Sequence, residues 1–259
     1  MATYLDKILA AHRGESAGDD RPLDALIDHA RQQGPPRGFR QALGSCEGLA
    51  VISEIKRRSP SKGEINPGVD PASWAQAYER GGATCLSVLT DREFFGGSPQ
   101  DLEQARSAVS LPVLRKDFCV SARHVCDARL FGADAVLLIV AALDDVELAD
   151  FHDLALELGL DVLVETHDEA EVDRAMAVGA TIIGVNQRDL TTFEVDQARA
   201  VRVAASLPDG VVRVAESGIR SPDDASALVD AGYHAVLVGE SLMTSGDPAR
   251  SVAELRALR

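Results

Sequence analysis

The stretch "DAVLLIVAALDDVELADFHDLALELGLDVLVET", residues 134–166, contains the unit from which most of the chain is built. Its two short apolar runs, 134–140 and 161–166, have the length and the branched residues of strands. The segment between them carries apolar residues at helical spacing. Runs that are apolar almost throughout indicate strands buried on both faces, as in a parallel sheet. The stretch therefore predicts a strand–helix–strand unit with parallel strands.

Apolar runs of this kind recur along the chain about 20 to 35 residues apart, the length of one strand and one crossover helix. The eight runs cover 49–56, 84–90, 111–118, 134–140, 161–166, 181–187, 211–217 and 234–240. Several helical segments between them end in Gly-Ala or Gly-Gly, a usual C-terminal cap. Eight units predict an α/β fold of the (β/α)8 TIM-barrel type. An open doubly wound sheet is the alternative, but neither a dinucleotide-binding fingerprint nor a P-loop follows any run.

The start of the chain does not share this repeat. Segments 4–13 and 22–33 have the apolar spacing of amphipathic helices, and "GPPRG" at 34–38 interrupts the helical pattern. We therefore expect a single barrel domain over residues 1–259, of which residues 1–47 form a helical N-terminal extension.

Composition and charge limit the classes of protein to which the chain can belong. Hydrophobic residues make up 46% of the 259 residues, enough for a sizeable core, and the net charge of -15 argues against a nucleic-acid partner. No apolar run reaches the roughly 18 residues of a membrane span, and the N-terminus lacks the pattern of a signal peptide. The six histidines show no metal-ligand spacing, so we predict no metal site. Buried, reduced thiols and a cytoplasmic location are predicted from the four cysteines, which form no C-x-x-C motif: Cys46, Cys85, Cys119 and Cys126.

Polar residues end most of the predicted strands. In a TIM barrel the active site lies at the carboxyl ends of the strands, and polar groups there are costly unless they share a water-filled mouth. Two lysines, three carboxylates and an amide suit proton transfer, because carboxylates and lysines tune each other's pKa. This set consists of Glu54, Lys56, Lys116, Glu165, Asn186 and Glu216.

The first of these strands runs into a basic stretch, "KRRSPSK" at 56–62. Glu54 and Lys56 are two residues apart, so on a strand they point to the same side, whereas Arg57 must point elsewhere. Arg58 and Lys62 fall in the following loop. We therefore expect Lys56 alone to reach the barrel mouth.

Taken one at a time, these residues also have ordinary structural explanations. Glu54 and Lys56 suit a strand-end ion pair, and the lysine of the third run suits the surface. Glu165 and Glu216 suit N-terminal caps of the following helices, and Asn186 suits a cap or a turn. Their joint occurrence at five strand ends favours a shared site.

A phosphate site is predicted at the last two strands. Gly218 and Gly239 follow them, next to hydroxyl side chains and ahead of helical segments. Loops in these positions of a TIM barrel commonly bind phosphate through backbone N–H groups. "SPS" at 59–61 supplies further hydroxyls, and glycines used only for tight turns are the alternative.

Eight motifs together resemble the indole-3-glycerol phosphate synthase family, in the order expected and over nearly the whole chain. They are "EIKRRSPSKGEI" (54–65), "SVLTDREFFGGS" (87–98), "PVLRKDF" (112–118), "VLLIVAAL" (136–143), "LVETHDEAE" (163–171), "IGVNQRDLTTFEVD" (183–196), "VAESGI" (214–219) and "AVLVGESLM" (235–243). The resemblance implies conversion of 1-(2-carboxyphenylamino)-1-deoxyribulose 5-phosphate to indole-3-glycerol phosphate, with loss of carbon dioxide and water.

The same resemblance implies roles for individual residues. Lys116 would protonate the substrate ketone as the ring closes, and Glu165 would act in the later dehydration. Lys56 would bind the substrate carboxylate or serve as a second acid, with Glu54 holding both lysines. Which lysine performs which protonation stays open. The remaining implied contacts are Asn186, Glu216 and Ser217 to hydroxyl or amine groups, Ser59, Gly218 and Gly239 to phosphate, Arg188 at the anthranilate end, and Phe95, Phe118, Leu137 and Leu190 around the aromatic ring.

The implied partner is a small phosphorylated molecule, with no cofactor, no metal, no nucleic acid and no membrane, and the family suggests a monomer. Two other functions fit the same fold. A class I aldolase would use Lys116 as a Schiff-base nucleophile. A non-catalytic binding barrel would have no use for both an acid and a base.

Overall fold

A closed barrel of eight parallel strands forms the centre of the computed structural model, which describes residues 3–258. The strands are hydrogen-bonded in the order β1-β10-β9-β8-β7-β6-β5-β4. Because β1 pairs with both β4 and β10, the sheet closes, so the TIM-barrel prediction is confirmed and the open sheet is wrong. The strands are β1 (Ala50–Ile55), β4 (Cys85–Leu89), β5 (Val113–Lys116), β6 (Ala135–Ile139), β7 (Asp161–Thr166), β8 (Ile182–Asn186), β9 (Val212–Glu216) and β10 (Ala235–Val238).

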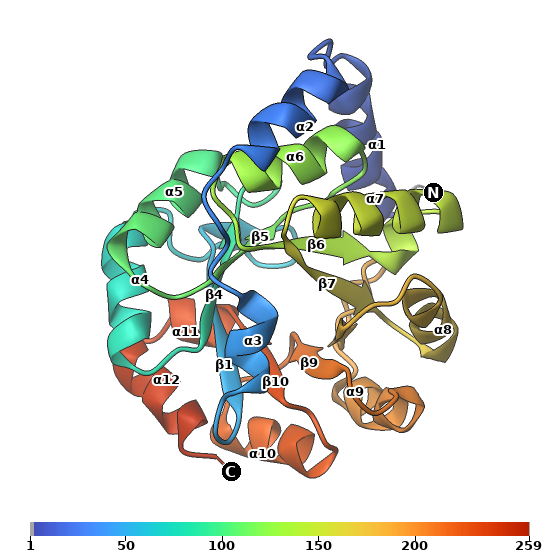
Figure 1. Cartoon of the computed structure of the whole chain (residues 1–259). Coiled ribbons are helices and arrows are strands. Elements are labelled where there is room, and N and C mark those ends of the chain that lie inside the picture. Colours follow the sequence, from blue (N-terminus) through green and yellow to red (C-terminus); the bar gives the residue numbers. More distant parts are fainter. Residues whose placement is uncertain (1–2, 259) are drawn as a thin grey trace.

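Helices surround the barrel as an outer layer (Figure 1). The main ones are α4 (Pro71–Arg80), α5 (Pro99–Ala108), α6 (Ala122–Leu130), α7 (Asp145–Glu157), α8 (Glu169–Ala177), α9 (Gln197–Val203), α10 (Pro222–Asp230) and α12 (Pro248–Arg256). Shorter elements are α11 (Glu240–Met243), η1 (Val140–Ala142) and η2 (Ala204–Ser206). Each of the eight main helices begins after an Asp or Ser whose side chain accepts a backbone N–H, which fixes where the helix starts.

The strands are buried on both faces, as their apolar sequences predicted. Every residue of β1, β4, β6 and β8 is buried. Burial on both faces leaves only the strand ends to carry polar chemistry, so the site must lie at an end of the barrel.

The N-terminal extension contains α1 (Tyr4–Ala17), α2 (Leu23–Arg31) and α3 (Phe39–Gly44). The first two were predicted; α3 was missed because six residues are too few to show a helical period. Helix α2 packs against α6 (Figure 1). Helix α3 lies at the amino ends of the strands, where the thiol of Cys85 meets the carbonyl of Phe39. Residues 1 and 2 of the predicted extension lie outside the described residues.

A small hairpin interrupts the loop between β1 and α4, where the sequence predicted only a loop. Its strands are β2 (Arg58–Ser59) and β3 (Gly63–Glu64), paired antiparallel. Gly63 turns the chain with φ +71, a backbone conformation that suits glycine. The hairpin places the serines of the basic stretch at the carboxyl end of the barrel.

The prediction of buried thiols is confirmed for Cys85, Cys119 and Cys126 and is wrong for Cys46. All four cysteines are free, and only Cys46 is partly exposed. Within residues 3–258, no helix has the length and apolar character needed to cross a membrane.

Candidate active site

A cavity of about 690 Å³ opens at the carboxyl ends of the strands. All fifteen residues that the sequence analysis named for the site line this cavity. They are Glu54, Lys56, Ser59, Phe95, Lys116, Phe118, Leu137, Glu165, Asn186, Arg188, Leu190, Glu216, Ser217, Gly218 and Gly239. The structure therefore brings these residues together, although contact with a cavity does not by itself assign a role.

The centre of the cavity holds a charged group that we call the Lys116 cluster: Lys116, Glu165, Asn186 and Glu216. The ammonium of Lys116 lies 2.7 Å from Glu165 Oε2 and 2.9 Å from Glu216 Oε2. Asn186 Nδ2 donates to Glu165 Oε1 at 3.0 Å. Four strands, β5, β7, β8 and β9, thus supply one connected network.

This geometry decides between the structural alternatives. The caps of α8 and α10 are Asp168 and Ser221, so Glu165 and Glu216 are not helix caps. The Lys116 side chain is 15% exposed, which excludes an ordinary surface lysine. Asn186 is both a turn residue and a residue of the site. Its Oδ1 accepts the backbone N–H of Arg188 in a local turn, while its amide nitrogen donates to Glu165.

Burial and charge separate the pKa values within the Lys116 cluster. Burial alone would lower the pKa of Lys116, but Glu165, Glu216 and Glu54 outweigh burial and raise it. Burial opposes ionisation of Glu165, yet Lys116, His167 and Asn186 lower its pKa to about 2. Burial and the charge of Glu165 outweigh Lys116 at Glu216, whose pKa rises to about 7. Of two adjacent carboxyls, Glu165 is therefore the ionised one and Glu216 the one that holds a proton more readily.

A second ion pair lies on β1 and just beyond its end. Lys56 Nζ lies 2.5 Å from Glu54 Oε1, so the strand-end pair exists and faces the cavity. Glu54 was expected to hold both lysines, but within residues 3–258 its hydrogen bond goes to Lys56 alone. Lys116 is instead held by Glu165 on β7 and Glu216 on β9, whose carboxylates reach its ammonium across the mouth of the barrel.

Two glycines make room for these carboxylates. A Cβ atom at Gly184, on β8, would collide with Glu216 Oε1. A Cβ atom at Gly239, directly after β10, would collide with Glu54 Oε1 and lie 3.2 Å from Lys56 Nζ. Gly239 therefore has a packing reason that the phosphate prediction did not consider.

Arg57 points away from the cavity, as side-chain alternation predicted, but the expectation that Lys56 alone reaches the mouth is wrong, because Lys62 also lines the cavity. Arg57 pairs with Asp101 of α5, in the helix layer. Arg58 donates to the backbone carbonyls of Arg92 and Glu93. Lys62 lies at the mouth, 3.3 Å from Glu240.

One wall of the cavity is apolar and aromatic. The rings of Phe95 and Phe118 lie 6.3 Å apart between centroids, and Leu137 and Leu190 line the same cavity. The sequence analysis missed three further residues of this lining, which belong to α1: Tyr4, Leu5 and Ile8. Their periodicity indicated an amphipathic helix but not where that helix packs.

Residues that follow β9, β10 and β1 bring hydroxyl and backbone groups to the cavity. Ser217 and Gly218 follow β9 with φ values of 66 and 75, two successive left-handed residues. A left-handed serine is uncommon and marks a constrained turn. Gly239 precedes α11, whose first N–H groups lack partners within the helix. Ser59 reaches the cavity from the hairpin, and Ser241 and Arg220 were not predicted.

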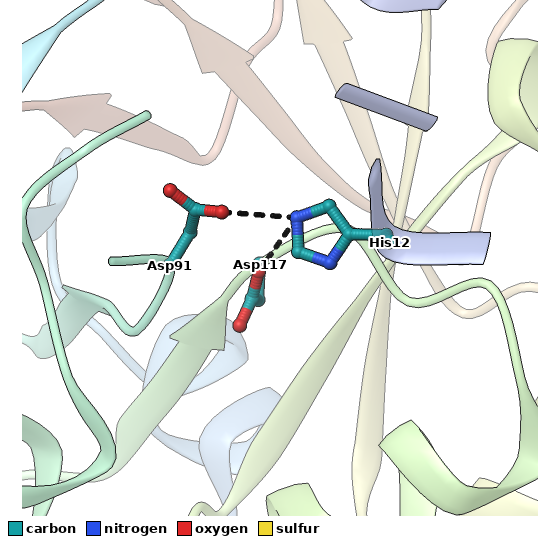
Figure 2. A group of neighbouring side chains, drawn as sticks. All are labelled: His12, Asp91 and Asp117. Carbon is teal, nitrogen blue, oxygen red and sulfur yellow. Dashed lines mark hydrogen bonds and ion pairs between the residues drawn. The ribbon is translucent and has the colours of Figure 1, made fainter. Parts of the chain in front are cut away.

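A further buried group, the His12 cluster, consists of His12, Asp91 and Asp117 (Figure 2). His12 Nε2 lies 3.0 Å from Asp91 Oδ2 and 3.8 Å from Asp117 Oδ1. Burial alone would lower the pKa of His12, but the hydrogen bond to Asp91 and the charge of Asp117 raise it. The cluster ties α1 to the loops that follow β4 and β5. No motif connects positions 12, 91 and 117, so the cluster could not be predicted from the sequence.

The three side chains of the His12 cluster have metal-ligand types, but their contacts are those of an ion-pair network. His12 and Asp91 already share a hydrogen bond. Asp117 accepts from Arg115 at 2.8 Å and from Thr90 at 2.5 Å, which offsets its charge. We therefore assign the His12 cluster to the attachment of α1.

A buried lysine held between two carboxylates at the mouth of a TIM barrel is the geometry of an acid–base enzyme. Comparison with known proteins makes the assignment specific. A family model described as "Indole-3-glycerol phosphate synthase" matches residues 5–255. The chain belongs to the indole-3-glycerol phosphate synthase family, whose members are carboxy-lyases of tryptophan biosynthesis.

Curated relatives agree with this family. The chain is 48% identical to the indole-3-glycerol phosphate synthase of Mycobacteroides abscessus over 254 residues, which cover 98% of this chain and 93% of the relative. It is 49% identical to that of Chlorobium luteolum over 246 residues, covering 94% of each. Among solved structures, the thiamine phosphate pyrophosphorylase of Pyrococcus furiosus superposes with a TM-score of 0.61 at 17% identity, covering 84% of this chain and 96% of that one, a likeness of fold alone.

Proposed function

We propose that the protein converts 1-(2-carboxyphenylamino)-1-deoxyribulose 5-phosphate to indole-3-glycerol phosphate by acid–base catalysis in the Lys116 cluster. The observation that carries this proposal is the position of Lys116 Nζ, which lies within 2.9 Å of two buried carboxylates in the cavity. A substrate oxygen that reaches this ammonium meets a proton donor and two potential proton acceptors at once.

The first step is ring closure. The aromatic carbon that bears the carboxylate attacks the ketone carbon, a carbon–carbon bond forms, and the carbonyl oxygen takes a proton from Lys116. The raised pKa of Lys116 keeps it in the ammonium form. Such an acid still protonates an alkoxide, because the alkoxide is the stronger base.

Loss of carbon dioxide follows and restores the aromatic ring. The electrons of the breaking carbon–carbon bond return to the ring, so this step needs little help from side chains. Lys56, paired with Glu54 at the cavity surface, is placed to bind the leaving carboxylate beforehand.

Dehydration completes the indole. The hydroxyl leaves with a proton from an acid, and Glu165, which the cluster keeps ionised, removes the ring proton. Asn186 orients Glu165 through its hydrogen bond. Over the full turnover an ionised carboxylate leaves as neutral carbon dioxide, so one proton is taken up from water.

The substrate has two ends that match two kinds of cavity lining. Phe95, Phe118, Leu137 and Leu190 suit the aromatic ring, and we assign Arg188, which also lines the cavity, to the anthranilate end. We assign the phosphate to the hydroxyl and backbone groups of Ser59, Gly218 and Gly239, and the sugar hydroxyls to Asn186, Glu216 and Ser217. This assignment predicts that inorganic phosphate inhibits the enzyme competitively. A lack of inhibition at saturating phosphate would contradict the phosphate assignment.

We also propose that the protein acts as a monomer in the cytoplasm. We propose that it uses no metal or cofactor, since none of the steps above requires either.

Addition of the carboxyphenylamino deoxyribulose phosphate, followed by measurement of indole fluorescence, tests the function. Absence of fluorescence at micromolar protein contradicts it. Borohydride trapping with a keto-phosphate tests the aldolase alternative, because a covalent adduct on Lys116 is expected only for a Schiff-base enzyme.

A further inference from the structure

His167 lies directly behind Glu165 and has no part in the mechanism above. It follows β7 by one residue, and Thr166 between them turns away and donates to the carbonyl of Gly184. His167 Nε2 lies 3.7 Å from Glu165 Oε1. This nitrogen is buried and, within residues 3–258, has no hydrogen-bond partner. A buried, unpartnered ring nitrogen directed at a carboxylate of the site calls for a functional explanation.

The other ring nitrogen fixes the protonation of the imidazole. Nδ1 lies 3.0 Å from Glu171 Oε2, the oxygen that also accepts the backbone N–H of His167 at 2.7 Å. An ionised carboxylate only accepts hydrogen bonds, so Nδ1 carries a proton. A neutral ring would then present the lone pair of Nε2 to Glu165, whereas an imidazolium presents an N–H group.

The charges around the ring favour the imidazolium. Burial lowers the pKa of His167, but Glu171, on α8, and Glu165 outweigh it and raise the pKa, against an opposing effect of Arg199 on α9. The relation is reciprocal, since the charge of His167 lowers the pKa of Glu165.

The mechanism gives this second cation a purpose. Lys116 and His167 are the two cations that favour the ionised form of Glu165. When Lys116 gives its proton to the substrate oxygen, it becomes a neutral amine and no longer compensates the charge of Glu165. A carboxylate that loses its counter-charge in a buried site takes up a proton and is no longer a base.

We propose that His167 is a positioning residue whose imidazolium, held by Glu171, keeps Glu165 ionised and oriented after Lys116 has given up its proton. The inference rests on the proposed role of Glu165 as the base of the dehydration. In this proposal Glu171 on α8 holds His167, and His167 in turn holds Glu165 at the cavity.

Replacing His167 by Gln removes the charge and supplies a neutral amide that can still donate a hydrogen bond. We expect kcat at neutral pH to fall about tenfold, less than the roughly 10²- to 10⁴-fold contribution of a general base because Glu165 itself remains, with KM within about twofold. The acid limb of the kcat–pH profile should move to higher pH, because Glu165 is then protonated more easily. The matched control is His152→Gln, since His152 is another buried histidine with an unpartnered ring nitrogen and lies on α7, outside the cavity lining. An unchanged acid limb in His167→Gln would overturn the proposal.

A titration by NMR tests the same coupling without activity. The imidazole signal of His167 is assigned in isotope-labelled wild-type protein through its connection to the backbone, so the assignment needs no variant. In the wild type its pKa should lie above the ordinary value of about 6.5, and in Glu165→Gln it should fall. An unchanged pKa in Glu165→Gln contradicts the inference, even if His167→Gln does not fold. Activity of Glu165→Gln is judged separately: if that variant remains fully active, the role of Glu165 is wrong, whatever the titration shows.

Discussion

The Lys116 cluster and the His12 cluster lie at the same end of the barrel, and each holds one cation between two carboxylates. They differ in how the carboxylates are satisfied. In the His12 cluster, Asp91 also accepts two backbone N–H groups and Asp117 also pairs with Arg115. In the Lys116 cluster, Glu216 Oε1 has no partner within residues 3–258.

This difference indicates that the His12 cluster is structural and that the Lys116 cluster is catalytic. Charges that are fully satisfied hold elements in place, and although Asp91 and Asp117 line the cavity, their carboxylate oxygens already have protein partners. A buried carboxylate with a free oxygen in a cavity is costly unless function requires it. The comparison predicts that changes in the Lys116 cluster mainly lower kcat, and that changes in the His12 cluster mainly lower stability.

The largest effect is expected from Lys116→Ala. Loss of a general acid removes an interaction made in the transition state, so kcat should fall by roughly 10²- to 10⁴-fold. Product affinity, measured by fluorescence titration, should be largely retained. If kcat stays within about threefold of the wild type, the comparison fails, and Lys56 becomes the better candidate for the acid.

Lys56→Met should have the next largest effect. Lys56 faces the cavity with a single carboxylate partner, and the substrate is an anion in a protein of net charge -15. A local positive charge offsets that field. We expect kcat/KM to fall by about two orders of magnitude, the scale of a lost buried charge contact. A small change in kcat/KM would contradict a role for Lys56 and leave the Lys116 cluster as the part of the site that carries the chemistry.

His12→Gln tests the structural side of the comparison. Hydrogen bonds to charged groups contribute about 1.5 to 3 kcal/mol, so the free energy of unfolding should fall by about that much while kcat stays within about twofold. The pKa of His12 is raised in the folded protein. The stabilising contribution is therefore complete below the unfolded pKa of about 6.5 and is lost as pH rises through the folded pKa.

Urea unfolding of the wild type and His12→Gln at several pH values measures this contribution. The stability difference should be largest at the acidic end and shrink toward alkaline pH. A difference that grows with pH would contradict the assignment. A large loss of kcat with unchanged stability would place the His12 cluster in the chemistry instead.

The smallest effects are expected from Arg58→Met and Lys62→Met. Arg58 donates to backbone carbonyls and Lys62 pairs with Glu240 at the mouth, so neither reaches the Lys116 cluster. Each should change kcat/KM by only about threefold, and less at high salt, because salt screens exposed charges. Measurements at two ionic strengths decide the matter. If Arg58→Met proves as damaging as Lys56→Met, the orientation of the β1 side chains has been misassigned.

The barrel and its polar strand ends could be predicted because both depend on local sequence. Burial on both faces makes strands apolar throughout, and two-residue alternation separates Lys56 from Arg57. The lining residues Phe95 and Leu190 came from the family resemblance, since an aromatic or a leucine in a loop carries no signal of its own.

Long-range packing could not be predicted. His12 lies in a segment with the apolar spacing of an amphipathic helix, but the sequence around it does not indicate that Asp91 and Asp117 are its partners. The same holds for Lys116, whose partners Glu165 and Glu216 come from strands far away in the sequence. His167 lay within a quoted motif, yet its direction toward Glu165 depends on how Thr166 turns at the end of β7.

The order of proton transfers gives the most direct test of the central claim, that Lys116 acts in ring closure and Glu165 in dehydration. Single-turnover reactions with substrate labelled in its carboxylate measure carbon dioxide and indole separately. The account predicts that Lys116→Ala releases neither product at an appreciable rate, whereas Glu165→Gln releases carbon dioxide faster than it forms indole. Release of carbon dioxide by Lys116→Ala at the wild-type rate would contradict it.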